Sequence, residues 1–179
     1  MTQAPASRIA LRTADASDAK ELHELIQANL EEGHLLPRTL GELTVHANRF
    51  VVAVKARKII GCAELAPLSP HVAEVRSLAV DGAARGSRVG VAIVDELRRR
   101  ARREGFEKLC AFTHAPAYFI HMGFSIVPHL WLAEKIFTDC VKCPRFRQCG
   151  QYAMVVPLDV AFDAERGYGL PAAASAPLA

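Results

Sequence analysis

Residues 76 to 91 read RSLAVDGAARGSRVGV, and this stretch decides how the chain is interpreted. Its apolar start predicts a strand over 77–80, and Asp81-Gly82 predicts a turn after it. The basic loop from Arg85 to Gly90 leads into a helix expected from Val89 to Glu104. A helix N-terminus preceded by glycines binds diphosphates, because free backbone N–H groups and the helix dipole point at the anion. The stretch therefore predicts a phosphate-binding loop.

A dinucleotide-binding Rossmann loop is the first alternative, and the glycine spacing excludes it. That loop needs Gly-x-Gly-x-x-Gly and an acidic residue about 20 residues farther on, at the end of a second strand. Here the glycines lie at positions 86, 90 and 105, and the next expected strand ends at Phe112-Thr113.

The loop instead resembles the acetyl-CoA pyrophosphate loop of GNAT-type N-acetyltransferases, whose pattern is Arg/Gln-x-x-Gly-x-Gly/Ala. Arg85 and Gly90 occupy the first and last positions of that pattern. Arg88 stands where the pattern has glycine and would add a cation near the phosphates. The resemblance implies that the strand end and the loop bind acetyl-CoA. The implied contact residues are Leu78, Ala79, Val80, Arg85, Gly86, Ser87, Arg88, Val89, Gly90 and Val91.

Composition places the chain among ordinary globular proteins. Its 179 residues suffice for one domain whose core needs neither disulfides nor metal, and 51% of them are apolar. The net charge of +3 argues against nucleic acid as a partner, since such proteins carry a strongly basic face. The densest basic run, residues 98–103, is interpreted as a solvated helix face, and an RNA- or membrane-binding patch is the alternative.

The sequence also predicts a compartment. No segment approaches the roughly 20 apolar residues that span a bilayer, so we expect no membrane partner. The first residues lack the continuous apolar core of a secretion signal. Five cysteines, an odd number without such a signal, suggest reduced thiols and therefore a cytoplasmic location.

Periodicity and turn residues divide the chain into a leader, one domain and a tail. Residues 1–7 are expected to form a flexible leader, 8–158 the domain, and 159–179 a disordered tail. Strands are expected at 9–12, 50–54, 59–65, 72–80, 108–113, 124–127 and 152–157, and helices at 15–30, 40–48, 89–104 and 115–122. This irregular mixture predicts an α+β fold with a central twisted mixed sheet flanked by helices, which is also the element order of the GNAT fold.

A second part of the resemblance lies in residues 115–124, APAYFIHMGF. GNAT enzymes carry an aromatic pair, three further residues and then Gly-Phe, and the second aromatic is usually a tyrosine that protonates the departing CoA thiolate. In this chain Phe119 holds that position, and Tyr118 lies one residue earlier, about 100° away around a helix. Tyr118 is therefore the candidate general acid.

Four segments together resemble the short, single-domain N-acetylglutamate synthases of bacterial arginine biosynthesis. They are LLPR (35–38), EVRSLAV (74–80), THAPAYFIHMGF (113–124) and PHLWLAEKIFTDCVKCP (128–144). The resemblance implies transfer of acetyl from acetyl-CoA to the α-amine of L-glutamate, by direct attack of the amine. Two alternatives stay open: a GNAT enzyme for another amine or a protein N-terminus, and an inactive acyl-CoA-binding regulatory module, for which Arg88 and Phe119 speak. A homodimer is compatible with the sequence.

Glutamate carries two carboxylates, so its site needs two cationic anchors, and arginine matches a carboxylate with two parallel hydrogen bonds. The candidates are Arg38 after the first helix, Arg76 on the strand beside the cofactor, and Lys135 in the segment opposite. A surface ion pair is the alternative for each of the three.

The ammonium of the acceptor must lose a proton before it attacks the thioester. Glu74, two residues before Arg76, is the leading base, directly or through water, and simple pairing with Arg76 is its alternative. Alternation along 72–80 predicts that Glu74, Arg76, Leu78 and Val80 share one face, with Val75, Ser77 and Ala79 on the other. The backbone N–H of Leu78 or Val80 is expected to hold the oxyanion.

The segment 128–150 contains the last notable pattern, C-x-x-C at Cys140 and Cys143 followed by Cys149. Three cysteines at this spacing resemble half of a metal site, either a structural zinc or an iron–sulfur cluster. The fourth zinc ligand would come from His129, His121 or Asp139. A loop that packs three small thiols against the sheet is the alternative.

Overall fold

The computed structural model describes residues 8–30 and 35–158. The predicted leader, 1–7, the predicted tail, 159–179, and residues 31–34 lie outside the described residues. No helix in the described part of the chain is long and apolar enough to cross a membrane.

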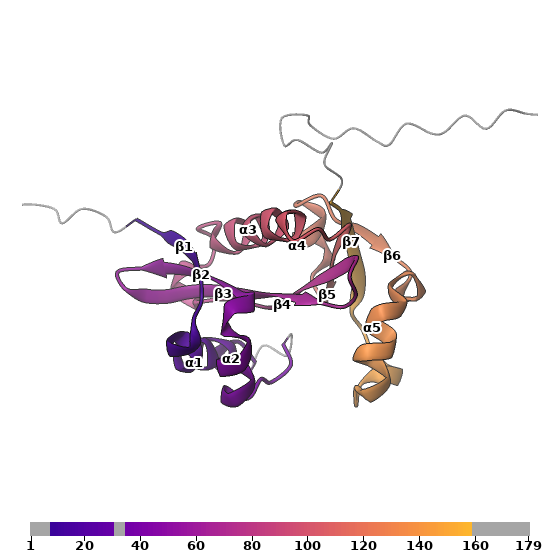
Figure 1. Cartoon of the computed structure of the whole chain (residues 1–179), viewed down its shortest axis with the longest axis horizontal. Coiled ribbons are helices and arrows are strands. Elements are labelled where there is room, and N and C mark those ends of the chain that lie inside the picture. The colour runs from indigo at the N-terminus through magenta and orange to yellow at the C-terminus, as the bar shows by residue number, and fades with distance from the viewer. Residues whose placement is uncertain (1–7, 31–34, 159–179) are drawn as a thin grey trace, which may run out of the picture.

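One mixed sheet of seven strands organises the domain (Figure 1). Its strands are β1 (Ala10–Thr13), β2 (Phe50–Lys55), β3 (Lys58–Pro67), β4 (Val72–Val80), β5 (Lys108–Thr113), β6 (Ser125–Val127) and β7 (Tyr152–Pro157). The spatial order is β1-β2-β3-β4-β5-β7-β6. Neighbours are antiparallel except β4 and β5, which are parallel. The predicted α+β class with a mixed sheet is therefore confirmed.

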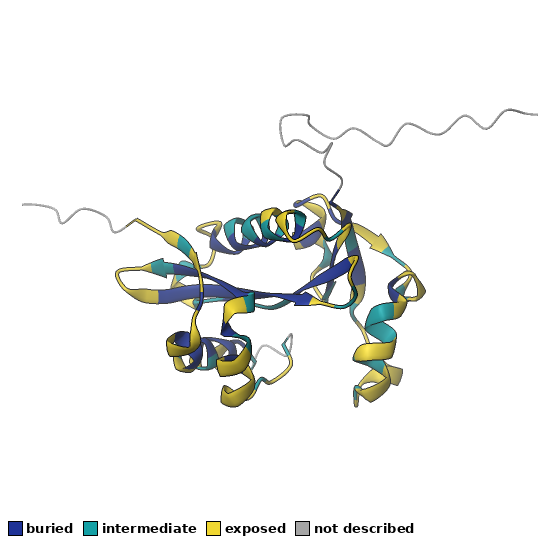
Figure 2. Cartoon of the chain, viewed as in Figure 1, coloured by how far each residue is buried: buried dark blue, intermediate teal, exposed yellow. Residues whose placement is uncertain are grey.

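Helices cover both faces of this sheet (Figure 1). They are α1 (Ala19–Leu30), α2 (Leu40–His46), α3 (Val89–Arg103), α4 (Pro116–Ile120) and α5 (Ala133–Thr138). The helices α3 and α4 lie on one face, and α1 and α2 lie on the other, with α5 near the β7 end. The buried residues line both sides of the sheet (Figure 2).

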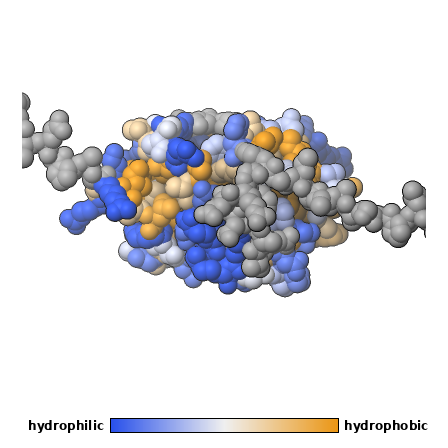
Figure 3. Space-filling model, turned by 90° about the horizontal axis from the view of Figure 1, so that it is seen from above, coloured by the Kyte–Doolittle hydropathy of each residue, from blue (hydrophilic) through white to orange (hydrophobic). Residues whose placement is uncertain are grey.

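The long helix α3 forms where the apolar period predicts it. Val89, Ile93, Leu97 and Ala101 recur at helical spacing and are buried in the core. The arginine run on this helix is only partly solvated. Arg99 and Arg103 are exposed and pair with Glu96, whereas Arg98, Arg100 and Arg102 are half-buried. Figure 3 shows many hydrophilic residues on the face of the molecule that carries this helix.

The end of β4 departs from simple alternation. Cys62 pairs with Ala79 and Glu64 pairs with Arg76, so β4 contains one residue more than β3 over this interval. Ser77 adopts a positive φ of 51° at this bulge. The extra residue turns Leu78 towards the α3 core and Ala79 towards the α1 core. The predicted face shared by Glu74, Arg76, Leu78 and Val80 is therefore wrong beyond Arg76.

The strands β4 and β5 separate at the same place. They pair from Val72–Lys108 to Val75–Ala111, and no pairing follows along the rest of β4. The separation leaves the backbone of 76–80 unpaired on its β5 side. Two cavities open around this gap.

The segment 128–150 contains regular structure that the sequence analysis did not predict. It contains α5 and several short 3-10 turns, which local periodicity did not predict. Because these turns are short and lack side-chain caps, they carry little local signal in the sequence.

Candidate functional site

The first cavity, of about 600 Å³, lies at the N-terminus of α3. We call it the loop cavity. Its walls are Asn29, Leu35, Leu78, Val80, Ala84, Arg85, Gly86, Arg88, Val89, Gly90, Val91, Thr113, Ala115 and Tyr118. Eight of the ten predicted cofactor residues are among them. Ala79 and Ser87 are not, because the bulge buries Ala79 against α1 and the Ser87 hydroxyl donates to the Ala84 carbonyl.

The loop presents unsatisfied backbone donors to this cavity. The N-cap residue of α3, Arg88, makes no side-chain cap hydrogen bond, so the first N–H groups of the helix stay available to an anion. Arg88 has φ of 62° and Gly86 has φ of 80°, which is the conformation that glycine adopts most easily. The helix that follows has fifteen residues, and its dipole favours negative charge at this end.

Asn29 is a residue of this cavity that the sequence analysis did not single out. It is buried at the end of α1 and donates to the Leu25 carbonyl at 2.8 Å. Its side-chain oxygen accepts from the Arg85 guanidinium at 2.8 Å. A polar residue on the buried face of an amphipathic helix is the one sequence signal that would have indicated it.

The two neighbouring aromatic residues of α4 point in different directions. Phe119 is 6% exposed and packs edge-on against Phe124 in the core. Tyr118 lines the loop cavity instead, and a Cβ on Gly90 would overlap its hydroxyl group. Burial raises the pKa of Tyr118 above its ordinary value, so its hydroxyl keeps its proton at neutral pH.

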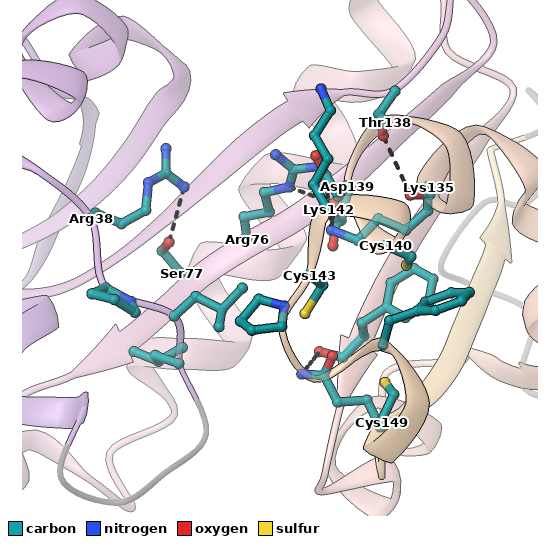
Figure 4. A pocket seen from close by; sticks show the side chains of 18 of the residues that line it. Arg38, Arg76, Ser77, Lys135, Thr138, Asp139, Cys140, Lys142, Cys143 and Cys149 are labelled. Atoms are coloured by element: carbon teal, nitrogen blue, oxygen red, sulfur yellow. Dashed lines mark hydrogen bonds and ion pairs between the residues drawn. The ribbon is translucent and has the colours of Figure 1, made fainter.

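The second cavity, of about 420 Å³, lies on the other side of the gap, and we call it the cationic cavity. Leu35 lines both cavities, so the two adjoin. Most of its wall comes from residues 35–38, the β4 residues 74–77, α5 and the cysteine-containing segment 139–149. Its cationic residues are Arg38, Arg76, Lys135 and Lys142. Figure 4 shows Arg38 across the cavity from the cluster of Arg76, Asp139 and Lys135.

Four charged side chains form one network at the wall of this cavity. Glu74 accepts from Arg76 at 2.5 Å and from Lys135 at 2.8 Å, both through Oε2. Asp139 accepts from the same two cations, with 2.9 Å to Lys135. Burial by itself would lower the pKa of Arg76, but Glu74 and then Asp139 outweigh it and raise the pKa. The predicted residues Glu74, Arg76 and Lys135 are thus brought together, and Asp139 joins them.

Arg38 is held on the opposite wall by acids that the sequence analysis overlooked. Its guanidinium donates to Glu64 at 2.8 Å, pairs with Glu42 at 3.0 Å and reaches the Ser77 hydroxyl at 3.3 Å. Glu64 is 1% exposed in the middle of β3. In the sequence, the position of Glu64 within an otherwise apolar run was the signal for a buried ion pair.

The three cysteines of the segment 140–149 line the cationic cavity but do not form the predicted metal site. Across residues 8–30 and 35–158, no three His, Cys, Asp or Glu side chains are arranged to hold a metal ion. Cys149 is exposed, whereas Cys140 and Cys143 are half-buried. Burial raises the pKa of the Cys140 thiol, which disfavours the thiolate that a metal needs. The structure therefore does not support a zinc or iron–sulfur site here.

The two remaining cysteines belong to the core. Cys62 and Cys110 are fully buried, and burial raises the pKa of the Cys62 thiol to about 12. The pKa of Cys110 is raised too, again mainly by burial. Neither thiol is therefore a nucleophile at neutral pH.

The sequence of this chain is similar to those of known acetyltransferases. The family model described as the acetyltransferase (GNAT) family matches residues 16–124. An uncharacterized N-acetyltransferase of Chlorobaculum tepidum is 29% identical over 154 residues, which cover 86% of this chain and 99% of that protein. An amino-acid acetyltransferase of Mycobacterium tuberculosis is 29% identical over 143 residues, which cover 78% of this chain and 82% of that protein.

Similarity in structure extends to larger proteins. The N-acetylglutamate synthase of Neisseria gonorrhoeae, solved with coenzyme A and N-acetyl-glutamate, superposes with a TM-score of 0.75 at 23% identity. The superposition covers 86% of this chain and 36% of that chain, and at 23% identity it shows a shared fold alone. The amino-acid acetyltransferase of Vibrio vulnificus likewise matches over 27% of its own length. The present chain thus spans roughly a quarter to a third of these two proteins.

Proposed function

The chain belongs to the acetyltransferase (GNAT) family, and from this premise we propose that it acetylates the α-amine of L-glutamate with acetyl-CoA. The product, N-acetylglutamate, would be the first intermediate of arginine biosynthesis, made in the cytoplasm. The relatives called amino-acid acetyltransferases support an amino acid as the acceptor.

One observation carries the choice of a dicarboxylic acceptor. A cavity with four cationic side chains adjoins the loop cavity across the gap between β4 and β5. Arginine and lysine at opposite walls suit an acceptor with a carboxylate at each end. An aliphatic or aromatic amine would offer no carboxylate to these cations.

The proposed reaction assigns each group one task. The backbone N–H groups of the loop and of the first turn of α3 bind the diphosphate of acetyl-CoA. Glu74 takes a proton from the acceptor ammonium, directly or through water, and the free amine attacks the thioester carbon. The backbone N–H of Leu78 or Val80, at the gap, holds the oxyanion of the tetrahedral intermediate.

Collapse of that intermediate completes the transfer. The carbon–sulfur bond breaks, the nitrogen releases its second proton to solvent water, the acetyl group stays on nitrogen, and the thiolate of CoA leaves. Tyr118, which lines the loop cavity and is protonated at neutral pH, donates its hydroxyl proton to that thiolate and regains a proton from solvent water. Arg38, Arg76 and Lys135 hold the carboxylates of the acceptor during these steps.

The test is the release of free CoA thiol from acetyl-CoA with L-glutamate and with a panel of other amines. Turnover of another amine but not of glutamate would reject the proposed acceptor. CoA binding without turnover of any amine would instead identify a regulatory module.

Arg76→Ala tests the proposed anchor. We expect the KM for glutamate to rise roughly 10- to 100-fold, because a charge-assisted hydrogen bond to the carboxylate is lost. Arg99→Ala, on the solvated side of α3, is the matched control and should leave the KM unchanged. Unchanged kinetics in R76A would remove Arg76 from the site.

A further inference from the structure

Asp139 has an unusual place in the four-residue network of Glu74, Arg76, Lys135 and Asp139. Both of its partners are cations that line the cationic cavity, and Asp139 lines that cavity with them (Figure 4). The Glu74 side chain, which meets the same two cations from β4, is 4% exposed, whereas that of Asp139 is 37% exposed. Glu74 therefore forms the buried side of the network, and Asp139 forms its open side.

The i,i+4 spacing from Lys135 explains only part of the position of Asp139, because its other partner, Arg76, lies on β4. Asp139 is the C-cap residue of α5, and its N–H donates to the Lys135 carbonyl at 3.0 Å. A carboxylate at a helix C-terminus is unfavourable, because the helix dipole places negative charge there. The interaction with the two cations must outweigh that cost. The attraction of Arg76 and Lys135 therefore holds the Asp139 carboxylate at the cavity wall.

We propose that the Asp139 carboxylate occupies the subsite for a carboxylate of the acceptor, and that the acceptor must displace it to bind. The proposal deepens, and rests on, the proposed function, because it specifies how the same cavity takes a dicarboxylate. Exchange of one carboxylate for another keeps the charge of the network balanced and leaves Glu74 in place. A neutral or cationic ligand cannot make this exchange without leaving Arg76 and Lys135 short of one anion.

The affinity for the acceptor carboxylate is therefore reduced by the fraction of molecules in which Asp139 holds the subsite. If the subsite is open in roughly one molecule in ten, removal of the competing charge improves the apparent Kd about tenfold. A residue that instead helped to bind the acceptor would show the opposite sign on removal.

Glutarate, a five-carbon dicarboxylate without an amine, is the probe, and calorimetry of the protein saturated with CoA measures its Kd. We expect D139N to bind glutarate about 3- to 10-fold more tightly than the wild type. The matched control is E134Q, since Glu134 lies on the same helix, and no ion pair of its carboxylate with Arg76 or Lys135 is found among residues 8–30 and 35–158. E134Q should change the affinity little, which separates displacement from a general change in charge. Should D139N fail to fold, as judged by thermal unfolding, D139S carries the same test.

Weaker or unchanged glutarate binding in D139N, or equal gains in D139N and E134Q, would overturn the proposal. Because the experiment measures glutarate binding, its result can be separated from the question of whether glutamate is the acceptor. Tighter glutarate binding in D139N, together with no wild-type turnover of glutamate, would keep the carboxylate subsite and reject only glutamate as the acceptor.

Discussion

Tyr118 and Phe119 show what a single position on a short helix decides. The two rings are adjacent in the sequence, but one faces the loop cavity and the other fills the core. A side chain that serves as an acid must reach the reacting sulfur. The direction in which the side chain points therefore matters more than its match to the family's sequence pattern. The structure places Tyr118 on the wall of the loop cavity and Phe119 in the core, and the role of Tyr118 as the acid remains a prediction.

Tyr118→Phe is expected to lower kcat roughly 100-fold and to change the KM for the acceptor little, because only the proton for the departing thiolate is lost. Steady-state kinetics across pH measures both constants. Tyr152→Phe, at an exposed position on β7, is the control and should behave as the wild type. A kcat unaffected by Y118F would assign the proton to water.

Arg88 carries both strain and charge at the N-terminus of α3. A non-glycine residue at φ of 62° costs about 1 kcal/mol, so Arg88→Gly should raise the free energy of unfolding by about that amount. The same change removes a cation from the loop cavity and should weaken CoA binding several-fold. Thermal unfolding and calorimetry with CoA measure the two effects.

Arg57→Gly provides the matched control for that substitution. Arg57 has φ of 68° in the turn between β2 and β3, and it does not line the loop cavity. R57G should therefore gain similar stability and bind CoA unchanged. Equal CoA affinity in R88G and R57G would show that Arg88 does not contact the phosphates.

Among the elements, α2 packs on the sheet through the buried Leu43, and a buried ion pair lies beside its N-terminus. Arg38, just before α2, contacts Glu64 on β3 across 26 positions of sequence. Its guanidinium also reaches Ser77 at the β4 bulge, so the pair links three elements that border the cationic cavity. Strand boundaries could be predicted from local pattern, as at β5 and β7, whose ends match the structure. The bulge in β4 and the Arg38–Glu64 pair could not be predicted in this way, because both depend on which strands are neighbours in the sheet.

Glu64→Gln is expected to lower the free energy of unfolding by about 3 kcal/mol, because Arg38 would lose its buried counter-charge. Urea unfolding monitored by circular dichroism measures the change. Glu24→Gln is the control, since Glu24 pairs with Lys20 at 3.9 Å on the surface and should matter little. Equal stability of E64Q and E24Q would contradict the structural role of the pair.

At the scale of the whole molecule, carboxylates whose pKa is lowered by folding make the free energy of unfolding depend on pH. The hydrogen bond from Arg12 lowers the pKa of Asp18 below its ordinary value. A depressed pKa in the folded state contributes stability that is present above the unfolded pKa, near 3.9, and is lost as pH falls through the folded pKa. Asp18 also caps its turn through the Asp15 N–H, so its ionised form holds both contacts.

The difference in free energy of unfolding between the wild type and Asp18→Asn should therefore shrink as pH falls below about 4. It should stay constant between about pH 6 and pH 8, where Asp18 is fully ionised. Urea unfolding at a series of pH values measures the difference. A constant gap down to about pH 2 would show that the Arg12–Asp18 pair does not stabilise the fold.

The sequence by itself determined the seven strands, the helices before residue 125, the mixed α+β class and the glycine-containing loop that opens α3. These features follow from local information: apolar period, glycine positions and the donors of a helix N-terminus. Only the tertiary structure decided that Tyr118 faces the cavity, that Asp139 shares the cations with Glu74, and that the cysteines do not gather as ligands. Lys135 lies 61 positions from Glu74, and such contacts depend on how the elements pack, which local periodicity does not record.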